Sequence, residues 1–194
     1  NGFEEGGFPP VGWITSTTGA GSWSSTTSYP YDGKVSLTAY TYKDDNSAIL
    51  QMPEIIVPTN TDIQISFVWG NGVPANLTKS TSETTVTGGD SIYFEVKTPG
   101  SEWKTLAICS QNDEVKKWLK QKVLLSDYKG QRLTARWRYH AMNVMKAGRA
   151  ALDNVEIIYV SSKGVPVINF TEWVAGRNQI STRWNASIAN YKQT

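Results

Sequence analysis

The chain has 194 residues, of which 19% are charged and 11% aromatic, and its formal net charge is +2. This length allows one domain plus an extension, and the many aromatic residues favour an all-β fold over a helical one. The charge argues against a nucleic-acid-binding protein, no apolar run of about 18 residues could span a membrane, and the single Cys109 excludes an internal disulfide or a zinc cluster.

The first 30 residues are rich in Gly, Ser and Thr. Phe3-Glu4 has the character of a short strand. Residues 15–28 are polar and low in complexity, so we expect a surface connection held in place by Trp23. The chain begins at Asn1 rather than Met, which we interpret as a removed signal segment or a trimmed chain.

Alternating apolar and polar residues predict most of the remaining elements. The clearest case is residues 62–69, where Ile63, Ile65, Phe67 and Trp69 face inward. Further strands are expected at residues 35–39, 48–52, 92–96, 103–108, 118–125, 133–139 and 151–159. Long loops are expected at 70–90 and 140–150. About nine or ten short strands separated by turn residues are typical of a sandwich or barrel.

The closing strand carries an unusual carboxylate. Asp153 shares the parity of Val155, Ile157 and Tyr159, so the alternation places it on the apolar face. An unpaired buried carboxylate is costly, so we expect a compensating cation. The best-placed second ligand is Glu4, if the first and last strands of the domain meet.

Residues 161–194 differ from the rest of the chain. Ser, Gly and Pro at residues 161–166 indicate a boundary. We therefore expect one β-sandwich domain over residues 1–160 and a linker with a C-terminal extension, or the start of a following domain, over residues 161–194. Apolar residues beyond Phe170 approximate helical spacing, although strands are an alternative.

Four segments, in order, are similar to a known family. Phe3-Glu4 with residues 8–13 (FPPVGW) resembles an FE…PPGW opening, and residues 46–53, 118–130 and 151–155 resemble three later motifs. The family comprises the cleaved-adhesin and choice-of-anchor modules of secreted Bacteroidetes proteins, which are related in fold to MAM domains. The resemblance covers roughly residues 1–160 and omits the tail.

This resemblance implies a jelly-roll β-sandwich, galactose-binding or MAM-like in architecture, in a secreted or cell-surface protein. It also implies a structural calcium ion joining the Glu of the first strand to the Asp of the last, so Glu4 and Asp153 inherit the metal-ligand role. Residues 15–23 lack the carboxylates that a second calcium site in such modules uses.

The carboxylates have two interpretations. Calcium takes about six to eight oxygen ligands, which Glu4, Asp153 and loop carbonyls could supply. The alternative is plain hydrogen bonding of both carboxylates to strand-end amides. Asp44 and Asp45 form a second oxygen-rich cluster, for which a solvated turn is the simpler interpretation.

Aromatic and arginine side chains supply candidate ligand contacts. Aromatic rings at loop tips can stack on sugar rings, and the candidates include Tyr31, Tyr42 and Trp103, with Trp23 and Tyr40 also considered. Arg136 and Arg138, with Arg132, share one outward parity and could hold a sulfated or uronic glycan in a bidentate manner. Core packing for the aromatics and ion pairs with neighbouring strands for the arginines are the alternatives.

No catalytic group is expected. His140 is the only histidine, and no Gly-x-Ser-x-Gly motif is present. Cys109 ends an apolar strand and fits a buried inert thiol. The sequence therefore predicts a non-catalytic module for adhesion or for binding a surface glycan or protein ligand, beside other domains of the same chain. The alternatives are a carbohydrate-binding accessory domain of a larger secreted hydrolase and a structural spacer.

Overall fold

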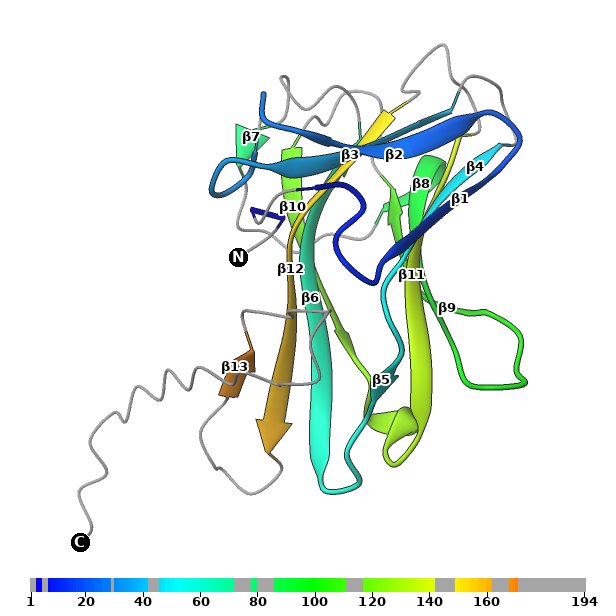
Figure 1. Cartoon of the computed structure of the whole chain (residues 1–194), viewed down its shortest axis with the longest axis vertical. Helices are drawn as coiled ribbons and strands as arrows, with labels where there is room; N and C mark the ends of the chain where they lie inside the picture. Colours follow the sequence, from blue (N-terminus) through cyan, green and yellow to red (C-terminus); the bar gives the residue numbers. More distant parts are fainter. Residues whose placement is uncertain are drawn as a thin grey trace, which may run out of the picture.

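The computed structural model describes residues 3–4, 7–28, 30–41, 46–71, 78–79, 86–110, 117–141, 149–161 and 168–170. They form two facing sheets (Figure 1). The first sheet consists, in spatial order, of β1 (Ile14–Thr18), β4 (Ser47–Gln51), β11 (Arg132–His140), β8 (Val86–Lys97) and β9 (Lys104–Ser110), with β5 (Ile55–Ile56) beside one end of β11.

The second sheet contains the closing strand in its middle. Its order is β2 (Gly21–Thr26), β3 (Ser36–Thr41), β12 (Arg149–Ser161), β6 (Thr61–Asn71), β10 (Lys117–Leu124) and β7 (Thr78–Lys79), with β13 (Ile168–Phe170) beside β12. A 3-10 turn at Ser126–Tyr128 precedes β11. The predicted all-β jelly-roll sandwich is confirmed, and most of the expected C-terminal extension lies outside the described residues. The boundary after residue 160 stays a prediction, since β13 lies beyond it and pairs with β12.

The core lies between the sheets and is built from the predicted inward positions. Ile63, Ile65, Phe67 and Trp69 of β6 are fully buried. On β11, every second residue from Leu133 to Tyr139 is buried, and the residues between them are partly exposed. The period of two in the sequence therefore corresponds to burial on one face of each strand.

A row of aromatic rings attaches the amino-terminal segment to this core. The ring of Trp13 stacks on that of Trp137, with centroids 5.6 Å apart. Phe3 packs edge-on against Trp13 at 5.9 Å. Aromatic pairs of this kind add to the stabilisation from burial itself. The segment 3–4 is not the short strand that we expected, because packing of Phe3, rather than strand pairing, holds it in place.

The polar segment at residues 15–28 is not a surface connection. It forms β1 and β2, which pair with β4 and β3 in opposite sheets. Trp23 is 3% exposed, and its indole N–H donates to the carbonyl of Ala48 at 3.0 Å. Because a Ser/Thr-rich strand at a sheet edge buries few apolar side chains, its composition resembles that of a loop.

The expected loops at 70–90 and 140–150 are also shorter than predicted. β6 extends to Asn71, β8 begins at Val86, and Thr78–Lys79 forms β7 beside β10. His140 belongs to β11, and Arg149 begins β12. Cross-strand pairing extends these strands beyond the residues whose alternation is visible in the sequence.

A β-bulge in β12 changes the side on which its residues point. Asp153 pairs with Val68 and Glu156 with Ser66, so two residues oppose Phe67 alone. Asn154 within the bulge has a φ of 51°. Leu152 before the bulge and Val155 within it both pack on the core. Asp153 therefore does not share a face with Val155, Ile157 and Tyr159, and the predicted apolar parity was wrong.

The backbone at Asn154 gives a first testable prediction. A left-handed conformation is costly for most residues, and Asn and Gly tolerate it best. Asn154→Ala is expected to lower the free energy of unfolding by about 1 kcal/mol, whereas Asn154→Gly should change it little. Urea denaturation of both variants measures the difference. Equal stability of the two variants would contradict a strained bulge.

Candidate ligand face and candidate metal centre

Two arginines lie on the outer side of the first sheet because β11 alternates. Trp137 points into the core, so Arg136 and Arg138 on either side of it point outward. β8 lies next to β11 with Glu95 opposite Arg136 and Tyr93 opposite Arg138. We call the outer surface formed by Tyr93, Glu95, Lys97, Trp103, Arg136 and Arg138 the arginine face.

Glu95 connects the two arginines. Its side chain is 6% exposed. Arg136 Nε donates to Oε2 at 2.6 Å, and Arg138 Nη2 donates to Oε1 at 2.8 Å. Burial by itself would raise the pKa of Glu95, but hydrogen bonds and charge from Arg138 and then Arg136 outweigh it and lower the pKa. The carboxylate is therefore held in its charged form.

Aromatic rings pack against the same two guanidinium groups. The Arg136 guanidinium lies 3.9 Å from the ring centroid of Trp103, and Lys97 Nζ lies 4.9 Å from that centroid. Arg138 lies 4.2 Å from the ring centroid of Tyr93. Cations over aromatic faces are attracted by the ring quadrupole. Each arginine thus has a carboxylate partner and a ring partner, which together restrict its rotamers.

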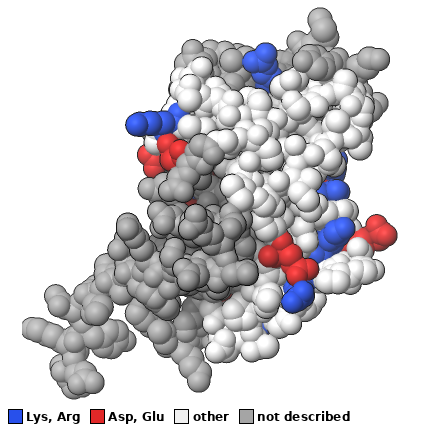
Figure 2. Space-filling view, in the orientation of Figure 1, with Lys and Arg blue, Asp and Glu red and all other residues white. Residues whose placement is uncertain are grey.

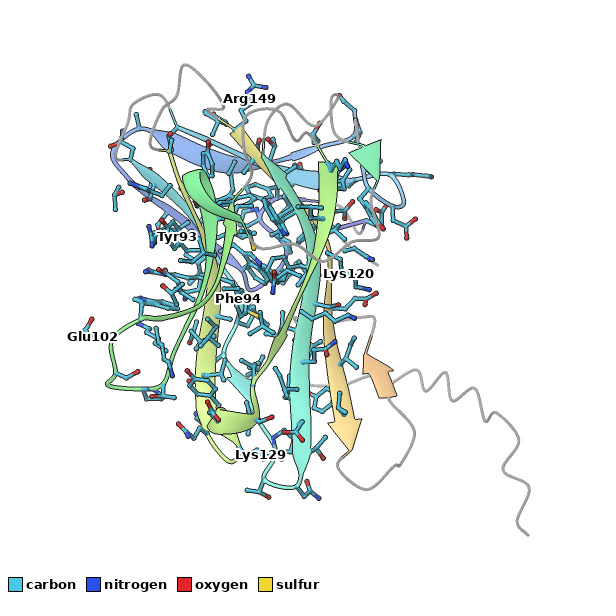
Figure 3. All side chains as sticks on the ribbon, turned by 180° about the vertical axis from the view of Figure 1, so that it is seen from behind. Tyr93, Phe94, Glu102, Lys120, Lys129 and Arg149 are labelled. Carbon is cyan, nitrogen blue, oxygen red and sulfur yellow. The ribbon has the colours of Figure 1, made fainter. Side chains whose placement is uncertain are left out.

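Neighbouring residues of β8 lie on opposite sides of the first sheet. Figure 3 shows Tyr93 on the outer side of the sheet and its neighbour Phe94 directed between the sheets, with Glu102 at the far end of the β8–β9 hairpin. Figure 2 shows Lys/Arg and Asp/Glu side chains interspersed on the side that it presents, over a mainly uncharged surface. This distribution agrees with the small net charge of the chain.

Asp153 lies on the outer side of the second sheet, where the turn at residues 31–32 covers it. Its side chain is fully buried. Oδ2 accepts hydrogen bonds from the amides of Tyr31 at 2.8 Å and Asp32 at 3.3 Å, and Oδ1 accepts one from Asn154 at 2.6 Å. The bulge directs Asp153 toward residues 31–32, on the same side as Ala151 and Val68.

Glu4 holds the next residues of the same turn. Its Oε2 accepts from the amide of Lys34 at 2.8 Å, and its Oε1 accepts from that of Val35 at 3.2 Å. A Cβ on Gly33 would displace the Glu4 carboxylate, and the φ of +66° at this position favours glycine in any case. Beside the carboxylate is a surface pocket whose lining also includes Ser25 and Thr26.

The structure brings the two predicted metal ligands to one turn. Burial raises the pKa of Asp153 to about 6; the amides of Asn154, Asp32 and Tyr31 oppose this rise, and the negative charge of Glu4 adds to it. Neither carboxylate forms an ion pair with a described Lys or Arg. Both carboxylates therefore accept backbone hydrogen bonds, as the alternative interpretation expected. Two negatively charged oxygen ligands close to one turn also suit a hard cation.

The side chains near Glu4 and Asp153 do not by themselves complete the coordination shell of a calcium ion. Within the described ranges, no group of three or more His, Cys, Asp or Glu is placed to hold a metal ion. A calcium ion at Glu4 and Asp153 would therefore need backbone carbonyls and water for its remaining ligands. Asp44 and Asp45 lie outside the described residues.

The predicted ligand-binding residues divide into two places. Trp103, Arg136 and Arg138 lie together on the arginine face. Tyr31 lies apart, over the second sheet, where its ring packs edge-on against Trp118 at 5.8 Å. Tyr42 lies outside the described residues.

Sequence reasoning missed Tyr93 and Glu95. Both occupy the outward parity of a strand whose inward residues were predicted, so alternation could have placed them outside. That they face Arg136 and Arg138 follows from β8 lying next to β11, and no local pattern encodes this pairing.

The remaining reactive groups are engaged or buried. Cys109 is fully buried, as predicted, and burial raises the pKa of its thiol. His140 Nδ1 lies 3.1 Å from Ser47 Oγ, and its ring packs edge-on toward Tyr93 at 6.5 Å. In the part of the chain that is described, no helix has the length and apolar character needed to cross a membrane.

Comparison with known proteins identifies the fold. No protein-family model and no curated protein matches the chain significantly. The K1 cleaved adhesin domain of Lys-gingipain from Porphyromonas gingivalis W83 is similar in structure, with a TM-score of 0.57 and 15% identity over 81% of this chain and 95% of that chain.

Carbohydrate-binding modules are similar as well. The CBM22-1 xylan-binding domain of Xyn10C from Paenibacillus barcinonensis has a TM-score of 0.51 and 19% identity over 83% of this chain and 92% of that chain. TmCBM61, solved with β-1,4-galactotriose, has a TM-score of 0.51 and 14% identity over 80% of this chain and 92% of that chain. At such identities the likeness shows a shared fold.

Proposed function

We propose that this chain is a non-catalytic module of a secreted or cell-surface protein that recognises a glycan through the arginine face. The adhesion and carbohydrate-binding interpretations share this chemistry. In both, the module brings a larger protein to a polysaccharide surface and leaves the bonds of that polysaccharide intact.

The observation that carries the proposal is the combination of aromatic rings with fixed charged groups on an outer sheet face. Trp103 is partly exposed and Arg138 has 23% of its side chain exposed. Glycan sites combine apolar ring surfaces with a few placed polar groups that fix orientation. Because Glu95 already positions the arginines, a ligand would not have to order them.

The fold neighbours support the same class of function. One is by its title a cleaved adhesin domain, another a xylan-binding domain, and a third was solved with a galactose oligosaccharide. Fold similarity at this level is an analogy. The side chains of the arginine face supply the physical argument.

We further propose that Glu4 and Asp153 hold a structural calcium ion. The carboxylates of Glu4 and Asp153 both accept from amides of the turn at residues 31–35, and Asp153 is fully buried, so they repel each other unless a cation or a proton compensates them. A bound cation would supply that compensation and would hold residues 31–35 against β12 and the amino-terminal segment. The two carboxylates and their hydrogen bonds to this turn support the site.

A glycan array probed with the labelled chain tests the function. We expect retention on at least one class of polysaccharide and no new reducing ends after prolonged incubation. Trp103→Ala is expected to weaken binding about tenfold, on the order of one aromatic contact. Tyr31→Ala, which removes a predicted aromatic on the other sheet, serves as the matched control.

Two results would contradict the proposal. One is the absence of retention on any glycan by a chain shown to be folded from its thermal transition. The other is a loss of binding in Tyr31→Ala with none in Trp103→Ala, which would move the site to the second sheet. Release of reducing ends would make the chain an enzyme.

A further inference from the structure

The arginine face carries more positive than negative charge. The arginine face has three cations, Lys97, Arg136 and Arg138, and one carboxylate, Glu95, which leaves a surplus of two positive charges. The other arginine of the same parity, Arg132, pairs instead with Glu54 at 3.1 Å. The surplus is therefore local to the neighbourhood of Trp103 and Tyr93.

The two arginines keep unused donors. A guanidinium has five N–H donors in a planar fork. Arg136 uses Nε toward Glu95, and its two Nη groups donate to no described residue. Arg138 uses Nε and Nη2 and leaves Nη1. A guanidinium group whose remaining N–H groups are free can bind a second carboxylate in a bidentate manner.

The surrounding surface suits an extended chain. In register with Arg136 and Glu95 lie Ile14 and Gln51 on one side and Thr105 on the other. Five strands at ~4.8 Å spacing give this row a width of roughly 19 Å. Arg136 and Arg138 lie two residues apart along β11, and the surface on either side of them leaves room for an extended ligand.

We propose that the arginine face binds a carboxylated polysaccharide, a polyuronate, with Arg136 and Arg138 receiving its carboxylates. This inference rests on the proposed glycan-binding function and names its substrate class. A surplus of two charges, held rigidly, matches a polymer with one carboxylate per sugar.

The geometry also assigns separate roles to the residues. Glu95 is a positioning residue because it holds both guanidinium groups and would itself repel the ligand's carboxylate. Trp103 and Tyr93 fix the planes of the forks at 3.9 and 4.2 Å. Lys97 adds a point charge but cannot bind a carboxylate in a bidentate manner. Replacing Lys97 should therefore weaken binding less than replacing Arg136.

Binding of size-defined oligogalacturonates, measured by isothermal titration, tests the proposal. The matched neutral ligand is the same oligosaccharide with its carboxyl groups reduced, and dextran sulfate is the sulfated ligand. We expect the oligogalacturonate to bind, the reduced form to bind at least about tenfold more weakly, and affinity to fall with salt.

Variants then locate the site. Arg136→Gln and Arg138→Gln should each weaken oligogalacturonate binding about tenfold or more, since hydrogen bonds between charged groups are strong. Arg132→Gln, the same charge change on the same strand, should alter affinity less than about twofold. Arg136→Lys keeps the charge and the fold but loses the fork, and should bind more weakly than the wild type.

The other outcomes separate the two proposals. Equal binding of the reduced and charged oligosaccharides would overturn the polyuronate assignment while the glycan-binding function stands. Tight binding of dextran sulfate with equal losses in all three Gln variants would overturn it as general polyanion attraction. Wild-type affinity in Arg136→Gln and Arg138→Gln would also overturn it. Failure to bind any glycan would remove the proposed function itself.

Discussion

Glu95→Ala is expected to lower the free energy of unfolding by about 3 kcal/mol. The substitution leaves Arg136 and Arg138 without their shared carboxylate, and these side chains are only 16% and 23% exposed. Removing one partner of a buried ion pair is costly because the remaining charge stays poorly solvated. Chemical denaturation at pH 7 measures the loss.

Glu54→Ala is the matched control for this substitution. Glu54 pairs with Arg132 on the same strand, but the arginine and glutamate side chains are 64% and 41% exposed. An exposed pair contributes less than about 1 kcal/mol. Similar losses in Glu54→Ala and Glu95→Ala would contradict the account of Glu95 as a buried partner of two arginines.

The pH dependence gives an independent check on Glu95. Because its pKa in the folded protein lies below the ordinary value of 4.5, its stabilisation is complete above about pH 4.5 and is lost as the pH falls through the folded-state pKa. The difference in stability between wild type and Glu95→Ala should therefore narrow in acid. If the stability difference between wild type and Glu95→Ala widened as the pH falls, the pKa of Glu95 would not be lowered by folding.

The second large effect concerns Asp153 in chelator-treated protein. Its pKa rises from 3.8 to about 6 on folding, so the folded state binds the proton more tightly than the unfolded state. The resulting stabilisation is complete below about pH 3.8 and lost above about pH 6. Relative to Asp153→Asn, wild type should lose roughly 2 kcal/mol between pH 4 and pH 7.

Calcium should reverse this trend. A bound cation favours the ionised carboxylates, so calcium should stabilise the wild type more at pH 7 than at pH 5. Calcium at 100 times its dissociation constant would add about 2.7 kcal/mol. Thermal unfolding with and without calcium measures the effect in the wild type, in Asp153→Asn and in Glu4→Gln, and both variants should lose the response.

Asp32→Asn provides the control, because Asp32 belongs to the same turn but, among the described residues, its carboxylate accepts from the amide of Gly33, at 2.9 Å. It should keep the calcium response. A wild type that gains no stability from calcium would remove the metal from the proposal and leave the two carboxylates as hydrogen-bond acceptors for the turn at residues 31–35.

Local patterns were sufficient for much of the sandwich. Alternation located the inward residues of β6 and β11 because a strand with one buried face must repeat with a period of two. Alternation failed at residues 15–28, because Trp23 is the one large apolar side chain in that segment and no period can be seen. It also failed at Asp153, because the bulge at Asn154 interrupts the period within the strand.

The candidate sites divide in the same way. The sequence by itself determined that Arg136 and Arg138 share an outward face, and the family resemblance paired Glu4 with Asp153. Only the tertiary structure decided that Glu95 lies between the arginines, since the partner of a strand is chosen by the packing of both sheets. Residues far apart in the chain meet through that packing, and no local period records it.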